Sequence, residues 1–414
     1  MPQRQLSPRW ILFILTGLNL FNYLDRFVLS AVLPPLQKDL HLNDGQAGAL
    51  VSAFVLGYFF TSPLFGYFGD RGSRKWLIAA GILVWSAGTV LTGFATTFLM
   101  ILAFRMLVGV GEASYATISP SYLSDTFAPA RRNNALTIFY VAIPVGAALG
   151  NILGGEIAAH WSWRQAFIFA GAPGLALALV LLPFAEPRRG SAEGRTKEAG
   201  KLPAARDVLR LFRRADYMLV AMGYVAYTFA MGAFGLWGPT FLNRVYAVPV
   251  ATAGTFFGEV LVVTGLVGTF AGGFAATAWQ RRDSSGYAQM LGWSVLAAVP
   301  VAFAAFLANT EVVCMSFMAA AMFLLFLSTG PVNTLILETV PINLRASAMA
   351  LSIFMIHLFG DMWSPQIVGV LSDHVGLKKA VLILPAALVV CAGLWLALAW
   401  KMRGRRIPKN AGLT

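Results

Sequence analysis

Gly66-Tyr-Phe-Gly-Asp-Arg-Gly-Ser-Arg-Lys75 is a short charged turn that joins two long apolar runs, at about 46–69 and 75–97. An α-helix needs about 20 mainly apolar residues to cross a bilayer, and each run reaches that length. Basic residues next to such runs are typical of loops on the cytoplasmic side of a membrane. The stretch therefore predicts two transmembrane helices joined by a tight basic loop.

The rest of the chain repeats this pattern. Of its 414 residues, 58% are hydrophobic and only 12% are charged, and the mean hydropathy is +0.69. That composition excludes a soluble globular protein and leaves little sequence for an aqueous domain. We predict an all-α membrane protein with twelve transmembrane helices, at about 10–36, 46–69, 75–97, 98–124, 133–158, 164–185, 217–242, 251–279, 287–309, 311–338, 346–371 and 377–400.

Two echoes between the halves of the chain indicate an internal duplication. The loop that begins at Gly66 is matched by Gly273-Phe-Ala-Ala-Thr-Ala-Trp-Gln-Arg-Arg, half the chain further on. Asp125 and Arg132 are matched at nearly the same offset by Glu338 and Arg345. Repeats of this kind build the central site of many secondary transporters. We predict two pseudo-symmetric six-helix bundles, at 1–185 and 217–401, with a cytoplasmic linker at 186–216 and a cytoplasmic tail at 402–414.

The distribution of basic residues predicts the orientation in the membrane. The net charge is +13, and most Lys and Arg residues fall on one side if both termini lie in the cytoplasm. An excess of basic residues in short loops marks the cytoplasmic side of a polytopic protein. Lys378 and Lys379 are a local exception. This reading accounts for the charge without a nucleic-acid partner, and we expect none.

The loop between the second and third predicted helices is a candidate conformational latch, formed by Gly66, Asp70, Arg71, Arg74 and Lys75. An acid at a helix end, followed by a basic turn, can bridge a neighbouring helix terminus in one conformation and release it in another. The alternative is that the charges only set the topology.

Four ionisable residues interrupt the apolar first and fourth helices. Asp25 and Arg26 lie near the middle of the first, and Arg105 and Glu112 share one face of the fourth. Charges at that depth are costly unless they meet a partner or a wet cavity. Adjacent helical residues project about 100° apart, so we expect Asp25 and Arg26 to reach different partners. An Asp held near Arg105 would act as a proton-coupling site, whereas the alternative is a static ion pair.

The C-terminal half offers two further candidate sites. Tyr227, Met231 and Phe234 follow helical spacing and form either a substrate-binding wall or ordinary packing. His357 and Asp361 lie at i, i+4 on one helix face. They are either a second titratable substrate-binding station or a packed histidine that an aspartate orients.

Several chemistries have no signature in the sequence. It contains no phosphate-binding loop of the Gly-x-x-x-x-Gly-Lys type, no His-Glu-x-x-His and no Gly-x-Ser-x-Gly. We expect no cofactor, no metal and no ATP-driven pumping, so an ion gradient is the expected energy source. A membrane enzyme that acts on lipid headgroups through Glu112 and His357 is a weaker alternative, as is a receptor.

Several motifs resemble known families. Gly66 to Lys75 resembles the loop signature of the major facilitator superfamily, with Ser73 at a position where the family prefers glycine. The spacing Arg-x-x-x-Gly-x-Gly-x-Ala that begins at Arg105 resembles a second signature. Three further stretches resemble spinster-like transporters in a bacterial form, namely Asn22-Tyr-Leu-Asp-Arg26, Gly109-Val-Gly-Glu-Ala-Ser-Tyr115 and Ile138-Phe-Tyr-Val-Ala-Ile-Pro-Val-Gly146.

This resemblance implies a proton-linked transporter of amphipathic lipids, such as sphingosine phosphate or lysophospholipids, in a bacterial inner membrane. It assigns proton coupling to Asp25, Arg105 and Glu112, and substrate contacts to Arg26, Arg105 and Tyr115. The partners we expect are a lipid or small-molecule substrate, protons and the bilayer, with the protein as a monomer. A small organic anion such as a sugar acid, or a drug, is the alternative substrate.

Overall fold

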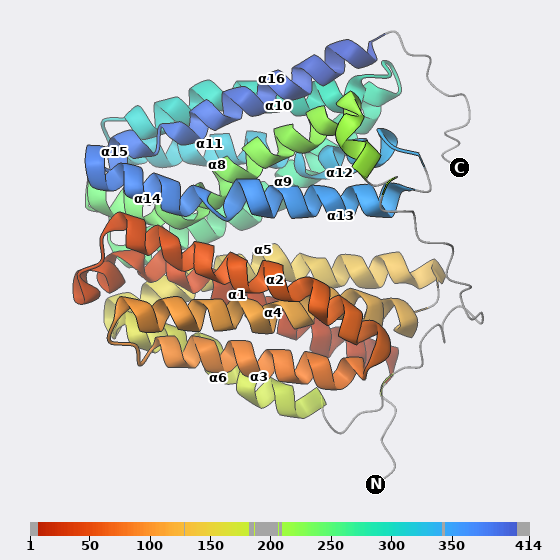
Figure 1. Ribbon diagram of the computed structural model, residues 1–414. Helices are drawn as coiled ribbons and strands as arrows, with labels where there is room; N and C mark the ends of the chain where they lie inside the picture. Colours follow the sequence, from red (N-terminus) through yellow and green to blue (C-terminus); the bar gives the residue numbers. More distant parts are fainter. Residues whose placement is uncertain are drawn as a thin grey trace. The chain divides into compact units, whose positions relative to one another are not determined.

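A computed structural model describes residues 7–127, 129–181, 186, 206, 209–341 and 344–403, and every regular element in these ranges is helical. Figure 1 shows the arrangement of the helices. Their bounds are α1 Pro8–Leu40, α2 Asp44–Arg71, α3 Arg74–Thr92, α4 Phe98–Thr126, α5 Pro129–His160, α6 Trp163–Leu181, η1 Arg210–Arg213, α8 Ala215–Tyr246, α9 Val250–Gln280, α10 Gly286–Leu307, α11 Glu311–Phe326, α12 Thr329–Glu338, α13 Arg345–Ile356, η3 His357–Asp361, α14 Ser364–Val375, α15 Leu377–Ala380 and α16 Ile383–Met402.

Ten helical spans within the described residues are long and apolar enough to cross a membrane. The two other predicted spans coincide with α6 and with the series α13, η3 and α14. The latter was predicted as one helix at 346–371, but a π-helical segment, His357–Asp361, interrupts it. The predicted helix at 311–338 likewise contains a break, between α11 and α12. The all-helical membrane fold is confirmed, with two spans less regular than the apolar runs suggested.

The chain divides into two compact units. Unit 1 holds residues 1–200, 236–259 and 365–373, and unit 2 holds 201–235, 260–364 and 374–414. The C-terminal part of α8, the first third of α9 and most of α14 therefore belong to the same unit as α1 to α6. The predicted division into bundles at 1–185 and 217–401 stays a prediction. Most of the predicted linker and tail lies outside the described residues.

Glycines allow the helices of unit 1 to pack at backbone distance. In unit 1, α1 packs on α5, α2 and α3 pack on α4, and α3 packs on α6. A Cβ at Gly109 of α4 would lie 2.1 Å from the carbonyl oxygen of Phe54 in α2. At Gly150 of α5 it would lie 2.3 Å from the carbonyl oxygen of Leu24 in α1. Small residues permit such close approach between membrane helices. The close contacts fix α1 and α4, which carry the four buried charges.

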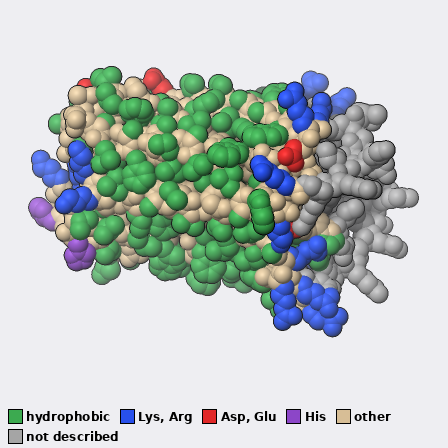
Figure 2. All heavy atoms as spheres, turned by 90° about the horizontal axis from the view of Figure 1, so that it is seen from above, with side chains coloured by type: hydrophobic (Ala, Val, Ile, Leu, Met, Phe, Trp, Pro, Cys, Tyr) green, Lys and Arg blue, Asp and Glu red, His purple; other side chains and the backbone are tan. Residues whose placement is uncertain are grey.

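Apolar side chains cover much of the surface. The face seen in Figure 2 is dominated by hydrophobic side chains, while Lys and Arg gather toward its two edges. Large side chains such as Phe274 and Trp400 are about three-quarters exposed, at 75% and 77%. In a soluble protein, contiguous exposed apolar surface of this kind would cause association. Here it is the surface that faces lipid.

Candidate transport site

Two ion pairs join α1 to α4 inside unit 1. Arg26 donates to Glu112 through Nη2 and Oε2, which lie 2.6 Å apart. The carboxylate of Asp25 faces Arg105, with 3.8 Å between Oδ1 and Nη1. The adjacent residues of α1 therefore reach different partners, as their angular separation predicts. Asp25 is thus held near Arg105, which is the condition for the predicted proton-coupling role, and that role stays a prediction.

The four charges are buried unequally. Asp25, Arg105 and Glu112 are at most 1% exposed, whereas the side chain of Arg26 is 27% exposed. Oδ1 of Asp25, Nη1 of Arg105 and Oε1 of Glu112 make no hydrogen bond to any described residue. Taking ions out of water costs several kcal/mol each, and incomplete hydrogen bonding leaves part of that cost uncompensated. Such a site is poorly suited to pure scaffolding, and buried ionisable groups at membrane depth are by default functional candidates.

Aromatic rings of α1 and α2 surround the two guanidinium groups. Phe54 lies close to both groups, with its ring centroid 4.7 Å from Cζ of Arg26 and 5.2 Å from Cζ of Arg105. The rings of Tyr23 and Tyr58 lie 4.9 and 5.8 Å from the Arg26 guanidinium. A desolvated cation over an aromatic face gains up to about 2 kcal/mol. These rings were not predicted as part of the site, although Phe54 and Tyr58 have i, i+4 spacing in the sequence.

Tyr115, predicted to contact substrate, is fully buried in unit 1. Its hydroxyl donates to the carbonyl oxygen of Leu15. Its ring packs edge-on against Trp85, with centroids 5.4 Å apart, and beside Phe139 at 6.2 Å. These contacts give Tyr115 a packing role between α1, α3, α4 and α5. Its role in binding stays a prediction.

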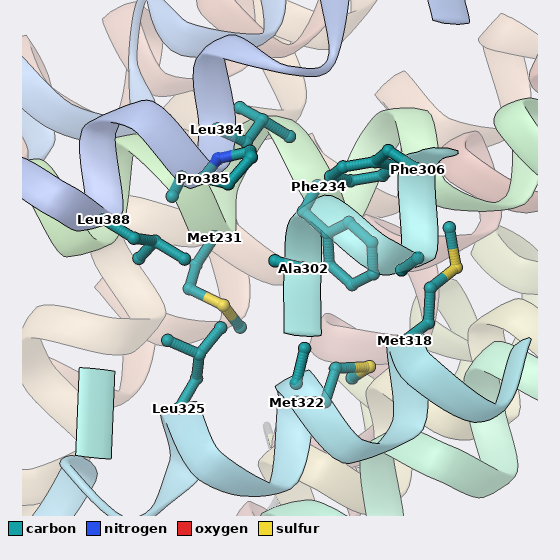
Figure 3. A pocket seen from close by; sticks show the side chains of 13 residues that line it. Met231, Phe234, Ala302, Phe306, Met318, Met322, Leu325, Leu384, Pro385 and Leu388 are labelled. Carbon is teal, nitrogen blue, oxygen red and sulfur yellow. The ribbon is translucent and has the colours of Figure 1, made fainter. Parts of the chain in front are cut away.

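Unit 2 contains an apolar cavity that is partly open to its surroundings, and its empty space of about 380 Å³ includes the open part. Met231 and Phe234 of α8 line it, as Figure 3 shows, together with Phe306 of α10. Its other walls come from α10, α11 and α16, and every lining side chain is apolar. The remaining lining residues are Ala230, Ala302, Ala305, Met318, Ala321, Met322, Leu325, Leu384, Pro385 and Leu388. The composition of the walls suits a hydrocarbon chain.

The other candidates of the C-terminal half lie elsewhere in unit 2. Tyr227 is not among the lining residues. It is 8% exposed and donates its hydroxyl to the carbonyl oxygen of Leu325. His357 and Asp361 meet through Nδ1 and both carboxylate oxygens at 3.0 Å, within the π-helical segment. Their side chains are 31% and 27% exposed. The predicted i, i+4 pair therefore exists, and its role in binding substrate stays a prediction.

The predicted latch forms contacts at the start of α3. Arg74 is 3% exposed and pairs with Asp125 at the end of α4, at 2.5 Å, and with Glu186, at 3.0 Å. The hydroxyl of Ser73 donates a hydrogen bond to the Glu186 carboxylate. The backbone amides of Arg74 and Lys75 donate to the same carboxylate. Because Ser73 supplies this hydrogen bond, a serine has a structural use here that glycine lacks.

The remaining latch residues contribute differently. Arg71 is exposed and stacks over Tyr67, with Cζ 3.8 Å from the ring centroid. The side chain of Asp70 lies outside what the structure describes. Arg74 bridges the start of α3 to the end of α4 through Asp125. The predicted release of this bridge in another conformation stays a prediction.

A second ion cluster, which sequence analysis missed, lies within unit 1 at the opposite end of α2. Both carboxylate oxygens of Asp44 accept from Arg244 of α8, at 2.7 Å each. Gln37 of α1 and Ser372 of α14 also donate to Asp44. Asp373 accepts the backbone amides of Asp44 and Gly45 at the α2 N-terminus. The cluster ties the ends of four helices together.

No group of three or more His, Cys, Asp or Glu side chains within the described ranges could hold a metal ion. The ionisable residues of α1 and α4 form mixed pairs of acid and base instead. Such an arrangement can bind an anion, exchange a proton or change partners. These are the operations that a secondary transporter needs.

Comparison with known proteins identifies the class of this protein. Residues 15–365 match the family model of the Major Facilitator Superfamily. A crystal structure of a bacterial homologue of the human lysosomal transporter Spinster, in an inward-facing and unoccupied conformation, superposes with a TM-score of 0.86. The two are 23% identical, and the match covers 97% of this chain and 99% of the other. The fold is that of a major facilitator transporter.

Sequence similarity narrows the family. The chain is 34% identical over 410 residues to protein spinster homolog 1 of Xenopus laevis, covering 92% of this chain and 77% of that protein. It is also 34% identical over 389 residues to a sphingosine-1-phosphate transporter of Danio rerio, covering 87% and 75%. The chain belongs to the spinster family of the Major Facilitator Superfamily. It is therefore a multi-pass membrane transporter for a small molecule or lipid rather than an enzyme.

Proposed function

We propose that this protein is a proton-coupled secondary transporter that moves an anionic amphipathic lipid, of the lysophospholipid or sphingosine phosphate type, by alternating access. The observation that carries the proposal is the presence, in one chain, of an acid–base cluster on α1 and α4 and of a cavity lined only by apolar side chains. An amphipathic anion needs a cation for its headgroup and an apolar wall for its chain.

Arg26 is the proposed headgroup ligand. It is the most exposed of the four charges, at 27%, and Glu112 holds one edge of its guanidinium. Guanidinium groups bind phosphate through paired, charge-assisted hydrogen bonds. A phosphate would compete with Glu112 for Arg26, and this competition links substrate binding to the charge of Glu112.

Asp25 is the proposed proton site. Its pair with Arg105 spans 3.8 Å, beyond hydrogen-bond distance, and Oδ1 makes no hydrogen bond to the described residues. A proton on Asp25 would neutralise the acid and leave Arg105 free to attract the anionic substrate. Loss of the proton would restore the ion pair. Alternation between these states couples the proton to the substrate.

The cavity in unit 2 is the proposed site of the lipid chain. Met231, Phe306 and Met322 give it flexible and aromatic walls without a polar atom to satisfy. Each buried methylene contributes about 0.8 kcal/mol, so even a short segment of acyl chain adds useful affinity. The similarity to a sphingosine-1-phosphate transporter supports this substrate class.

Uptake into proteoliposomes tests the proposal. Labelled lysophospholipid and a labelled sugar acid are offered with and without an imposed pH gradient. We expect lysophospholipid to accumulate with the gradient and the sugar acid to remain outside. Accumulation of the sugar acid alone would overturn the lipid assignment and favour the small-anion alternative.

We also propose that both termini lie in the cytoplasm of a bacterial cell and that the inner-membrane protein is a monomer. Cys314 and Cys391 are both buried, so a cysteine added within 402–414 would carry the reporting label. Protection from an impermeant thiol reagent in intact cells is expected. Labelling from outside would contradict the orientation, and a dimeric mass in detergent would contradict the monomer.

A further inference from the structure

Thr89 of α3 stands next to the proposed proton site and has a choice of two acceptors. Its side chain is fully buried. The hydroxyl donates to Oδ2 of Asp25 and also lies 3.0 Å from the carbonyl oxygen of Trp85, one turn earlier in α3. A threonine hydroxyl has one hydrogen, so it can serve only one of these acceptors at a time.

The state of Asp25 decides between the two acceptors. An ionised carboxylate only accepts, so the Thr89 hydrogen points at Asp25. A proton on Oδ2 turns the carboxyl into a donor toward the Thr89 oxygen, and the Thr89 hydrogen must then turn to the carbonyl of Trp85. In both states the Asp25 Oδ2 atom and the Thr89 hydroxyl are hydrogen-bonded to each other. Asp25 can therefore gain or lose its proton without leaving either of these two buried atoms unpaired.

We propose that Thr89 is a positioning residue for the proton site. Its hydroxyl holds the Asp25 carboxylate and sets the pH at which that carboxylate takes up its proton. This inference rests on the proposed function. Thr89 is the hydroxyl donor to Asp25 among the described residues. The charges that act on Asp25 are Arg105 and Glu112 from α4 and Arg26 from its own helix. Substitution of Thr89 leaves all three in place.

The same helix contains a matched control. Thr92 is also fully buried and donates to the carbonyl oxygen of Gly88, at 2.8 Å. This bond to the preceding turn is common for threonine in helices and serves no carboxylate. Thr92 therefore shares the local bond of Thr89, and it makes no hydrogen bond to an ionisable group in the part of the chain that the structure describes.

Packing around Thr89 selects the test variants. A Cβ at Gly171 of α6 would lie 2.9 Å from the Thr89 Cβ, so this side of α3 has little free space. Thr89→Val preserves the branched shape and removes the hydroxyl. Thr89→Ser preserves the hydroxyl and removes the methyl group. Together they separate hydrogen bonding from packing.

The titration of Asp25 can be followed without a substrate by infrared difference spectroscopy of the full chain in lipid as the pH is changed. The carbonyl band of protonated Asp25 is identified by its absence in Asp25→Asn. In Thr89→Val we expect the midpoint of this band to move to higher pH by about one unit, a tenfold change in proton affinity, because the ionised form loses a charge-assisted hydrogen bond. Thr89→Ser and Thr92→Val should titrate as the native protein does.

Three results would overturn the inference. An unchanged midpoint in Thr89→Val would show that Thr89 does not set the titration of Asp25, while the proton site itself would stand. An equal shift in Thr92→Val would show that the shift comes from a general change in helix packing. Absence of any band that depends on Asp25 would overturn this inference together with the proton site of the proposed function. If Thr89→Val does not fold, Thr89→Ala removes the same hydroxyl and carries the same expectation.

Discussion

The interior of α1, α3 and α4 in unit 1 and the cavity of unit 2 are opposite solutions to burial in a membrane protein. The first buries two acids and two bases whose hydrogen bonds are incomplete. The second leaves a space of about 380 Å³ with only apolar walls. The sequence echoes that suggest duplication begin at Gly66 and Gly273, in the last turns of α2 and α9. The difference teaches that the two halves can share a helical framework while their interiors differ in chemistry. One interior holds ionisable side chains, and the other holds a cavity with apolar walls.

Removing one charge from the interior of unit 1 should have the largest effect. Glu112→Leu leaves Arg26 without its partner, and we expect the free energy of unfolding to fall by about 3–5 kcal/mol. Thermal unfolding in detergent measures the loss. The double variant Arg26→Leu/Glu112→Leu should regain most of it, because no buried charge is then left alone.

The control for this experiment is Glu156→Leu on α5, whose carboxylate is 46% exposed. It should change stability by less than about 1 kcal/mol. Equal losses in Glu112→Leu and Glu156→Leu would mean that the buried pair has no special weight in unit 1.

Loss of the ring close to both guanidinium groups should have the next largest effect. Phe54→Leu removes the cation–π contacts to Arg26 and Arg105 but keeps an apolar side chain. We expect a loss of about 2 kcal/mol in stability, measured by thermal unfolding. Phe60→Leu, on the same helix, is the control, because that ring is 66% exposed. A smaller loss in Phe54→Leu than in Phe60→Leu would show that the Phe54 ring only packs.

Filling the cavity of unit 2 should affect lipid binding and spare the charged interior. Ala321→Leu adds three carbons to the wall, and we expect lysophospholipid affinity to fall about tenfold as space for the chain is lost. Equilibrium binding of labelled lysophospholipid measures it. Val390→Leu on α16 is the control, since that side chain is 57% exposed and does not line the cavity. Unchanged affinity in Ala321→Leu would place the lipid chain elsewhere.

The smallest expected effect concerns Glu186, which accepts hydrogen bonds from Ser73 and Arg74 at the start of α3. Burial works to raise the pKa of this carboxyl, but hydrogen bonds from Ser73 and Arg74 outweigh it and hold the pKa below the usual range. A depressed pKa stabilises the folded state above the unfolded value of about 4.3, and this stabilisation is lost as the pH falls through the folded value.

Glu186→Gln should therefore cost about 1 kcal/mol at pH 7, and the difference from the native protein should shrink as the pH falls below about 4. Thermal unfolding at several pH values measures it. Glu156→Gln controls for the loss of an exposed carboxylate. A difference that is constant with pH would contradict the pKa argument.

The sequence predicted some parts of this structure because they depend on local periodicity. Apolar runs located the spans, and the angular separation of Asp25 and Arg26 predicted their different partners. The π-helical segment at His357–Asp361 was missed, because a change in hydrogen-bond register leaves the apolar run unchanged. Met231 and Phe234 were chosen for their spacing, but the cavity beside them depends on small side chains of other helices, such as Ala302.

Contacts between distant residues account for what else the sequence did not predict. Arg244 and Asp44 are 200 residues apart, and no local pattern relates them. In the sequence Thr89 looks like any helical threonine, because its hydrogen bond to Asp25 of α1 exists only in the folded chain. Phe54 can be recognised as part of the site only from the fold, which brings the guanidinium groups of Arg26 and Arg105 close to its ring. In each case tertiary packing decides which of several ordinary residues acquires a special neighbour.

The most direct test of the central claim separates exchange from accumulation in Asp25→Asn. An uncharged residue that imitates the protonated acid should permit exchange of labelled for unlabelled lysophospholipid across proteoliposome membranes, but it should abolish accumulation driven by a pH gradient. Asp39→Asn, which removes a carboxylate on the same helix outside the cluster, should keep both activities. We predict exchange without accumulation in Asp25→Asn, and gradient-driven accumulation at the native level would contradict the assignment of Asp25 as the coupling residue.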